Sequence, residues 1–493
     1  MVHGNDRPYL LSVLDAAKRY GINHLEIAGM NPTFSEEFTQ YPKQSALIEE
    51  IAQRGKKQGL DVYVWIREFN VRGRDLKTDP ATPEGKAFWD GRQNALRAAL
   101  GLMPSLTGVV MSYGSTPTEI WNVRGDSFWQ QMTPPQRIRF STERFRDVAV
   151  REFHKEMFVR DFNHSPNQLH WLVDGLRDED GIIMHSKAEP QDWQFFYPHS
   201  FAQGAYGKTP QVVEFDLAGE YWGCSFIPVS LVEYLKYRWD YDRSKGAKGV
   251  VGRIDRDNDR ALGAPSEINL YAHSILMGKP DTSAQEIYDG WNFSRYGLKP
   301  KSPESNRLTE IYRRCTEVVK LQYYTLGFWA PKAQTSLPDS MRSMESTLKS
   351  KSTAQWDPAA KPTEALLLDP TPHTVARILH DKAESVRLAG QNLAEISTLE
   401  GAMRPADYKP FRDQLVFMLD QAKVWESMAQ AFWTTKLALK NTAGKDAAHS
   451  AIEAFDTQLH GLQNSDAPQF VAHLQRSGVK LVADMKRRLD AGE

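Results

Sequence analysis

The sequence predicts an α/β protein: a (β/α)8 TIM barrel followed by an all-helical C-terminal domain. Up to about residue 280, short runs rich in β-branched and aromatic residues alternate with amphipathic helical patterns. This alternation is typical of repeated βα units and a parallel sheet. After about residue 300, apolar residues recur at spacings of three and four, which indicates a helical bundle. We therefore expect a barrel domain at 1–297 and a helical domain at 298–493.

Seven strands of the barrel can be counted along the chain. They are NHLEIAG (23–29), DVYVWIREFN (61–70), LTGVVMSYG (106–114), EMFVRDFNH (156–164), GIIMHSKAEP (181–190), QVVEFDLAG (211–219) and KGVVGRIDRD (248–257). The eighth must precede them, and MVHG has the pattern of a strand end, so we expect a truncated first strand or a natural N-terminus that lies upstream. A doubly wound open sheet is the rival fold, but no glycine-rich phosphate-binding turn follows any strand.

The helical domain is expected to carry no chemistry of its own. Its apolar periodicity covers 305–329, 373–399, 408–441 and 467–492. A segment rich in Ser, Pro and Lys near 331–362 interrupts the helices and is expected to be a surface excursion. We expect the helices to pack against the barrel or to form a homodimer.

Composition excludes several classes of function. Lys and Arg total 61 against 62 Asp and Glu, and no basic block is interleaved with aromatic residues, so we expect no nucleic acid partner. Two cysteines exclude a disulfide framework and a cysteine metal cage. No apolar run approaches the roughly 18 residues of a membrane span, so we expect no membrane partner. The N-terminus shows no export signal, and the location stays open: periplasmic or secreted if an upstream segment is missing, otherwise cytoplasmic.

Each predicted strand has an apolar body followed by polar residues. In barrels of this type the active site lies at the carboxyl ends of the strands, so these side chains should meet at one mouth. Alternate residues of a strand share a face, so Glu214 and Asp216 should point the same way. The residues that we expect to contact substrate are Arg67, Arg160, Lys187, Trp193, Glu214, Asp216 and Arg253.

Carboxylates near these strand ends suggest glycoside hydrolysis, which needs a protonated acid for the leaving oxygen and carboxylates that activate water. Glu220 lies just past the seventh strand, and Asp192 precedes a run of aromatic residues. Glu119 is the carboxylate that follows the fourth strand. For each of them the alternative interpretation is a solvated loop carboxylate, and for the aromatic run it is a loop folded over the barrel.

Metal-binding patterns are incomplete. Asp255, Asp257 and Asp259 alternate as in a calcium loop, but Arg260 stands where that loop needs glycine, and its twelfth position is Ser266. The histidines show no HExxH or comparable spacing. We therefore expect neither a metal nor a cofactor.

The order of these motifs resembles the α-glucuronidases of glycoside hydrolase family 67 from about Gly59 to Gly297. The segments that carry the resemblance are LKTDPATPEGKAFW, LTGVVMSYG, GIIMHSKAEPQDWQFFYP, KTPQVVEFDLAGEYWG and SEINLYAHSIL. The resemblance implies a barrel followed by a helical domain, and removal of glucuronic acid or its 4-O-methyl ether from xylo-oligosaccharides with inversion. It also implies that Asp192 and Glu220 jointly hold the water, and that Arg160 and Lys187 contact the substrate carboxylate.

The chain departs from that family at two places. The family has a general acid in a turn after the fourth strand, whereas MSYGSTPTE has Ser112 at the position of the family's lysine and no Glu in the turn, which leaves Glu119 as the candidate acid. We also expect the chain to lack the N-terminal β domain of the family. Our hypothesis is an inverting glycosidase that removes a terminal α-linked uronic acid or related sugar from polysaccharide-derived oligosaccharides. The alternatives are a non-catalytic carbohydrate-binding barrel and a barrel lyase or isomerase with Lys187 or His185 as base.

Overall fold

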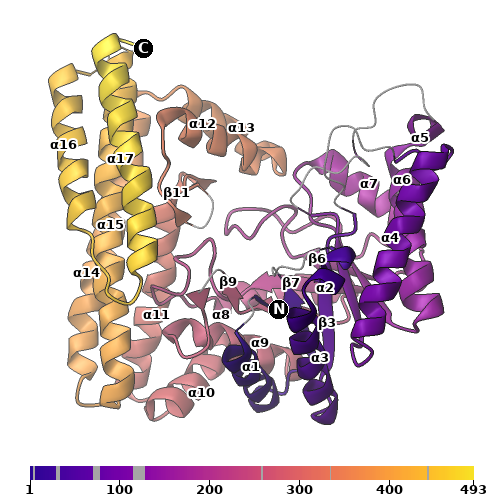
Figure 1. The fold of residues 1–493 in the computed structure, drawn as a ribbon. Helices are drawn as coiled ribbons and strands as arrows, with labels where there is room; N and C mark the ends of the chain where they lie inside the picture. The colour runs from indigo at the N-terminus through magenta and orange to yellow at the C-terminus, as the bar shows by residue number, and fades with distance from the viewer. Residues whose placement is uncertain are drawn as a thin grey trace.

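The computed structural model describes residues 1–3, 6–28, 34–69, 78–114, 121, 128–256, 259–332, 335–440 and 443–493. Its centre is a parallel sheet of eight strands in sequential order (Figure 1). The strands are β1 (Val2–His3), β2 (His24–Ala28), β3 (Asp61–Ile66), β4 (Gly108–Ser112), β5 (Glu156–Arg160), β6 (Ile183–Lys187), β7 (Gln211–Asp216) and β8 (Val250–Arg253). The predicted (β/α)8 barrel with C-terminal helices is confirmed.

The first strand is hydrogen-bonded on both sides. Val2 of β1 lies opposite Ile27 of β2 in parallel register. On the other side, the amino group of Met1 donates to the carbonyl oxygen of Gly252 at 2.8 Å, and the amide of Ile254 donates to the carbonyl oxygen of Met1 at 3.1 Å. These bonds join the last strand to the first, and closing a sheet in this way removes its exposed edges.

Helices surround the strands. They are α1 (Arg7–Arg19), α2 (Ser35–Gln40), α3 (Pro42–Lys57), α4 (Pro83–Leu102), α5 (Phe128–Gln131), α6 (Pro134–Arg146), α7 (Pro166–Leu176), α8 (Val232–Ser244), α9 (Ile268–Gly278) and α10 (Ala284–Tyr296). Their starts follow ordinary capping chemistry: the Ser165 side chain accepts from the amide of Gln168, and proline occupies the first position of α7.

One βα unit of the barrel lacks its helix. Residues 188–210, all of which the structure describes, form turns and bends between β6 and β7. We define this stretch as the β6–β7 loop. It contains Asp192 and Trp193, so two of the predicted site residues lie on a long, largely buried loop that follows a strand's carboxyl end.

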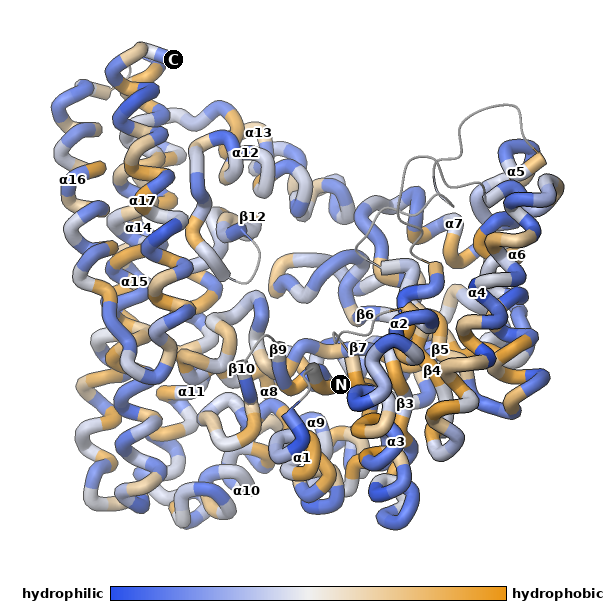
Figure 2. The backbone as a smooth tube through the Cα atoms, in the orientation of Figure 1, coloured by the Kyte–Doolittle hydropathy of each residue, from blue (hydrophilic) through white to orange (hydrophobic). Residues whose placement is uncertain are grey.

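The C-terminal helices are α11 (Pro303–Tyr323), α12 (Met341–Ser350), α13 (Lys361–Leu368), α14 (Pro372–Ile396), α15 (Pro405–Leu439), α16 (Lys445–Gly461) and α17 (Pro468–Ala491). Of these, α14, α15, α16 and α17 stand upright beside the barrel, whereas α12 and α13 extend sideways from the upper part of this bundle (Figure 1). Polar and apolar residues alternate along α14, α15 and α17 in Figure 2, as the periodicity predicted. α15 packs against α14 and α16 and buries large side chains such as Trp425 and Phe432.

The segment near 331–362 differs from our expectation of a surface excursion. It contains α12, whose Met341, Met344 and Leu348 are buried. Their spacing of three and four places them on one face of a helix, a signal that the surrounding Ser and Lys residues concealed. The segment continues to Lys351, which reaches the barrel mouth.

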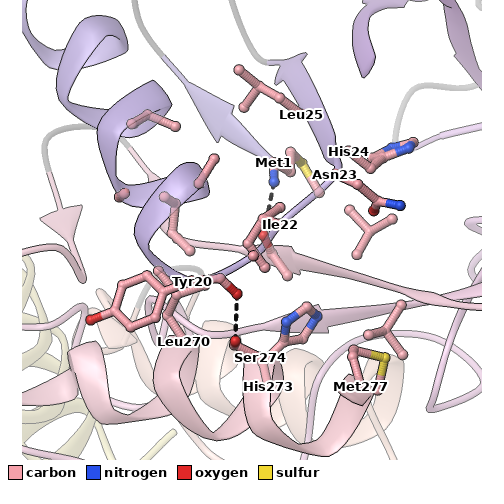
Figure 3. Close-up of a pocket in the computed structure, with 18 of the residues that line it drawn as sticks. Met1, Tyr20, Ile22, Asn23, His24, Leu25, Leu270, His273, Ser274 and Met277 are labelled. Atoms are coloured by element: carbon pink, nitrogen blue, oxygen red, sulfur yellow. Dashed lines mark hydrogen bonds between the residues drawn. The ribbon is translucent and has the colours of Figure 1, made fainter. Parts of the chain in front are cut away.

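A cavity of about 470 Å³ opens beside the short β1, between the strands and α1 and α9 (Figure 3). Ile22, Leu25 and Val250 line it, so it lies towards the amino ends of β2 and β8. This is the end of the barrel opposite the one that carries active sites in this fold. Within the described part of the chain, no helix has the length and apolar character needed to cross a membrane.

Candidate active site at the carboxyl ends of the strands

The indole of Trp193 is surrounded by cations from three strands. Lys187 Nζ lies 3.6 Å from a ring centroid of Trp193, and the guanidinium carbons of Arg253 and Arg160 lie 4.3 Å and 6.0 Å away. These distances fall within the range of cation–π contacts. The ring is only 2% exposed, and its Nε1 donates to the carbonyl oxygen of Glu214 at 3.3 Å. Trp193 is thus a buried support for the cations, not an open stacking platform.

Arg160 is paired with Glu214. Its Nε donates to Glu214 Oε2 at 2.5 Å and its Nη2 to Oε1 at 2.9 Å, a bidentate geometry. Burial alone would raise the pKa of Glu214, but Arg160 and His185 outweigh burial and lower it. Trp65 and Phe162 flank the guanidinium at 4.9 Å and 4.7 Å. The Arg160 guanidinium, which we expected to bind a substrate carboxylate, therefore binds a carboxylate of the protein instead.

Asp192 accepts three hydrogen bonds. Lys187 Nζ donates to Oδ1 at 2.7 Å, while the Tyr221 hydroxyl and Lys351 Nζ donate to Oδ2 at 2.6 Å and 3.0 Å. Burial opposes ionisation of Asp192, but the two lysines more than compensate and hold its pKa well below the usual range. Burial also lowers the pKa of Lys187 to about 8. Lys187 and Lys351 therefore hold Asp192 in its ionised form.

Lys351 is a site residue that sequence analysis missed. It follows α12 and lies 159 positions from Asp192 in the chain. A lysine in a Ser- and Lys-rich segment carries no local signal of function. Only the fold of the C-terminal helices brings it to the barrel mouth.

Glu220 is held by Arg253 and Asp216. Arg253 Nη1 lies 2.7 Å from Glu220 Oε2, and Arg253 Nη2 lies 3.0 Å from Asp216 Oδ2. Asp216 in turn accepts the backbone amides of Gly219 and Glu220 at 3.1 Å and 2.7 Å. Burial raises the pKa of Asp216, although Arg253 opposes this. Asp216 and Arg253 therefore orient Glu220.

The backbone after Glu220 is strained. Cys224 and Ser225 have positive φ angles of 56° and 57°, a conformation that residues other than glycine adopt rarely. Gly223 has a φ of 93°, and a Cβ there would come within 2.3 Å of Ile227. Gln414 of α15 donates to the carbonyl oxygen of Ser225 at 2.9 Å. The helical bundle thus supports this turn, and such strain is typical of functional loops.

A buried polar column continues from the mouth into the lumen. The His185 ring lies 3.6 Å from Glu214 and 3.7 Å from Glu26. Glu26 accepts from Trp65 Nε1 at 2.7 Å and pairs with His24 Nε2 at 2.8 Å. Burial lowers the pKa of His185, whose side chain has no exposed surface. Because the His185 side chain is fully buried, a substrate at the mouth cannot contact it in this structure.

The β6–β7 loop is clamped by Arg238 of α8. Arg238 Nη2 donates to the carbonyl oxygen of Tyr197 at 2.7 Å, and its Nε lies 3.4 Å from Glu189 Oε1. These two contacts lie on either side of Asp192 in the sequence. Burial raises the pKa of Glu189 to about 7.

Arg67 and Glu119 complete the set of predicted site residues. Arg67 is half-buried directly after β3. Glu119 lies outside the described residues. Among the residues that the structure does describe, no group of three or more His, Cys, Asp or Glu side chains is arranged to hold a metal ion.

Comparisons with known proteins identify a fold. No family profile matches the chain, and no curated protein sequence matches it. A GH138 enzyme targeting pectin rhamnogalacturonan II is 10% identical with a TM-score of 0.62, over 99% of this chain and 63% of that one. A GH115 4-O-methyl-α-glucuronidase with specificity for decorated arabinogalactans is 9% identical with a TM-score of 0.52, over 98% of this chain and 57% of that one. CpGH84B is 11% identical with a TM-score of 0.50, over 99% and 76%.

The chain therefore has a fold found in glycoside hydrolases of several families. It spans about three fifths of the length of the GH138 and GH115 proteins. These similarities do not single out family 67.

Proposed function

We propose that this protein is a glycoside hydrolase that removes a terminal α-linked uronic acid from oligosaccharides. The observation that carries the proposal is the placement of Asp192 and Glu220. Each is ion-paired with a cation on the same indole, that of Trp193, at the carboxyl ends of the strands. The two lysines that contact Asp192 hold its pKa low and keep it charged, as a group that orients and deprotonates a water must be. The glycosidase-like fold supports the same class.

In this proposal Asp192 and Glu220 hold the attacking water, and Glu119 protonates the leaving oxygen. An inverting enzyme needs about 6.5 to 9.5 Å between acid and base so that a water fits beneath the sugar. The uronic acid part of the proposal depends on Lys351, the most exposed of the four cations named at the mouth, because an accessible cation in a partly buried site favours an anionic sugar.

The stereochemistry of the product tests the reaction. Wild-type protein incubated with an aldouronic acid, the α-linked uronic acid on a xylo-oligosaccharide, should release the β-anomer first, followed over time by its equilibration. Proton NMR of the anomeric signals measures this directly. First release of the α-anomer would show retention and contradict the proposed roles of Asp192 and Glu220.

The role of Glu119 predicts a dependence on the leaving group. The Glu119→Gln variant should lose about 10²- to 10⁴-fold in kcat/KM on an aldouronic acid, the usual contribution of a general acid. It should lose far less on an aryl α-uronide whose phenolate leaves without protonation. Equal losses on both substrates would assign Glu119 another role. Glu364→Gln on α13 is the matched control, which should behave as wild type on both.

A non-catalytic carbohydrate-binding barrel is the second candidate. The three hydrogen bonds that Asp192 accepts favour it, since they leave this carboxylate a weak base. Calorimetric binding of uronides, with no product from any of them, would support this candidate over hydrolysis.

A further inference from the structure

Asp192 presents a difficulty for any mechanism in which it acts as a base. Its two lysine partners and the Tyr221 hydroxyl stabilise the charged form. A carboxylate that is so strongly stabilised accepts a proton poorly. One of these donors would have to leave before Asp192 could help to activate a water.

Lys351 differs from the other cations of the mouth in its exposure. Its side chain is 23% exposed, whereas Arg160 is 8%, Lys187 3% and Arg253 2% exposed. Arg160 is also bound bidentately by Glu214, and Lys187 lies between the rings of Trp193 and Phe162. Of these four cations, Lys351 is the one that an incoming ligand can reach.

The backbone of Lys351 is fixed, whereas its side chain is partly exposed and its Nζ also donates to the Tyr221 hydroxyl at 3.1 Å. The Tyr197 hydroxyl donates to the carbonyl oxygen of Lys351 at 2.8 Å. Five residues later, Trp356 Nε1 donates to Gln191 Oε1 at 3.3 Å, beside Asp192 in the sequence. Two contacts thus tie this part of the C-terminal segment to the β6–β7 loop. The lysine's four-carbon stem allows its ammonium to change partner without movement of the chain.

We propose that Lys351 binds the carboxylate of the substrate sugar and leaves Asp192 when it does so. This inference rests on the proposed function and deepens it. A uronate carries the same charge as Asp192, so it competes with Asp192 for the ammonium group. Once Lys351 has moved, Lys187 still holds Asp192 in place, but one of its two cations is gone and its proton affinity rises. A neutral sugar has no charge with which to draw Lys351 away.

In this mechanism, binding of the substrate carboxylate to Lys351 raises the proton affinity of Asp192 and so allows Asp192 to act as a base. The mechanism also assigns the C-terminal helices a function: they supply the residue that recognises the anionic sugar. A glycoside without a carboxylate would bind without releasing Asp192, and the barrel would remain in the paired state.

Binding calorimetry with D-glucuronate and D-glucose tests the inference without requiring turnover. The Lys351→Met variant should lose about tenfold or more in affinity for glucuronate, as expected for a charged hydrogen-bonding partner, and should bind glucose as wild type does. Lys349→Met is the matched control: this exposed lysine lies two positions earlier, in the last turn of α12, and its variant should retain both affinities. Lys351→Arg, which keeps the charge, should retain a preference for glucuronate.

Equal affinity for glucuronate in wild type and Lys351→Met would overturn the inference, as would failure of the wild type to bind glucuronate. A melting temperature close to that of wild type, measured for each variant, ensures that the comparison concerns folded protein; if Lys351→Met is unfolded, Lys351→Gln takes its place. Selective loss of glucuronate binding together with no hydrolysis of any uronide would uphold the role of Lys351 as a binding residue and reject the proposed reaction.

Discussion

Replacing Glu220 with glutamine is expected to lower kcat for uronide release by about 10²- to 10⁴-fold, the usual contribution of a general base. Glutamine has nearly the same shape, and its side-chain carbonyl can still accept a hydrogen bond from Arg253. It cannot take a proton from water. Binding of glucuronate should therefore change little while turnover falls, and steady-state kinetics with calorimetry on the same preparation would separate the two.

Glu317→Gln on α11 is the control, because its half-exposed carboxylate pairs only with the neighbouring Lys320 in the contacts described. It should turn over substrate as wild type does. Turnover near the wild-type rate in Glu220→Gln would end the assignment of Glu220 as a base. A matching loss of both affinity and turnover would instead indicate that Glu220 shapes the site.

Replacing Arg253 with methionine is expected to have the largest effect on stability. Arg253 is buried and bridges two buried carboxylates, Asp216 and Glu220. Removing one partner of a buried ion pair leaves an uncompensated charge, which typically costs about 3–5 kcal/mol. Urea unfolding followed by tryptophan fluorescence should show a clear fall in the midpoint urea concentration. The activity of the variant should also fall, because Glu220 loses its orienting partner.

Arg243→Met on α8 provides the comparison. Arg243 is partly exposed and pairs with the exposed Asp281 at 3.0 Å, and a surface pair of this kind contributes between about 0 and 1 kcal/mol. The two variants remove the same chemical group, so they differ mainly in burial. If Arg253→Met unfolded at the same urea concentration as Arg243→Met, the buried network around Glu220 would not be an important source of stability.

The barrel could be predicted because its signal is local. Runs such as 108–111 and 182–184 are apolar, and polar residues follow them at the carboxyl end of each strand. Parallel βα units place those ends together, so the sequence was enough to expect Lys187, Glu214 and Arg253 at one mouth. In the sequence, the β6–β7 loop was marked only by a run of aromatic residues, and the absence of a helix there was not predicted.

The pairing of these residues could not be predicted in the same way. Arg160 was expected to face a substrate carboxylate, yet it binds Glu214, 54 positions further along the chain. A buried cation pairs with a carboxylate that the fold places next to it, and strand periodicity does not show which carboxylate that is. The same reason explains why Trp193 was expected to contact substrate and is found beneath three cations.

The sequence by itself determined the architecture, the end of the barrel at which active sites of this fold lie, and most of the side chains found there. It could do so because hydrophobic periodicity and the order of elements are properties of short segments. Tertiary structure alone decided which charges neutralise one another and that Lys351, from beyond the barrel, completes the surroundings of Asp192. Those outcomes depend on contacts between residues far apart in the chain, whose energies are set by burial and distance in the folded molecule.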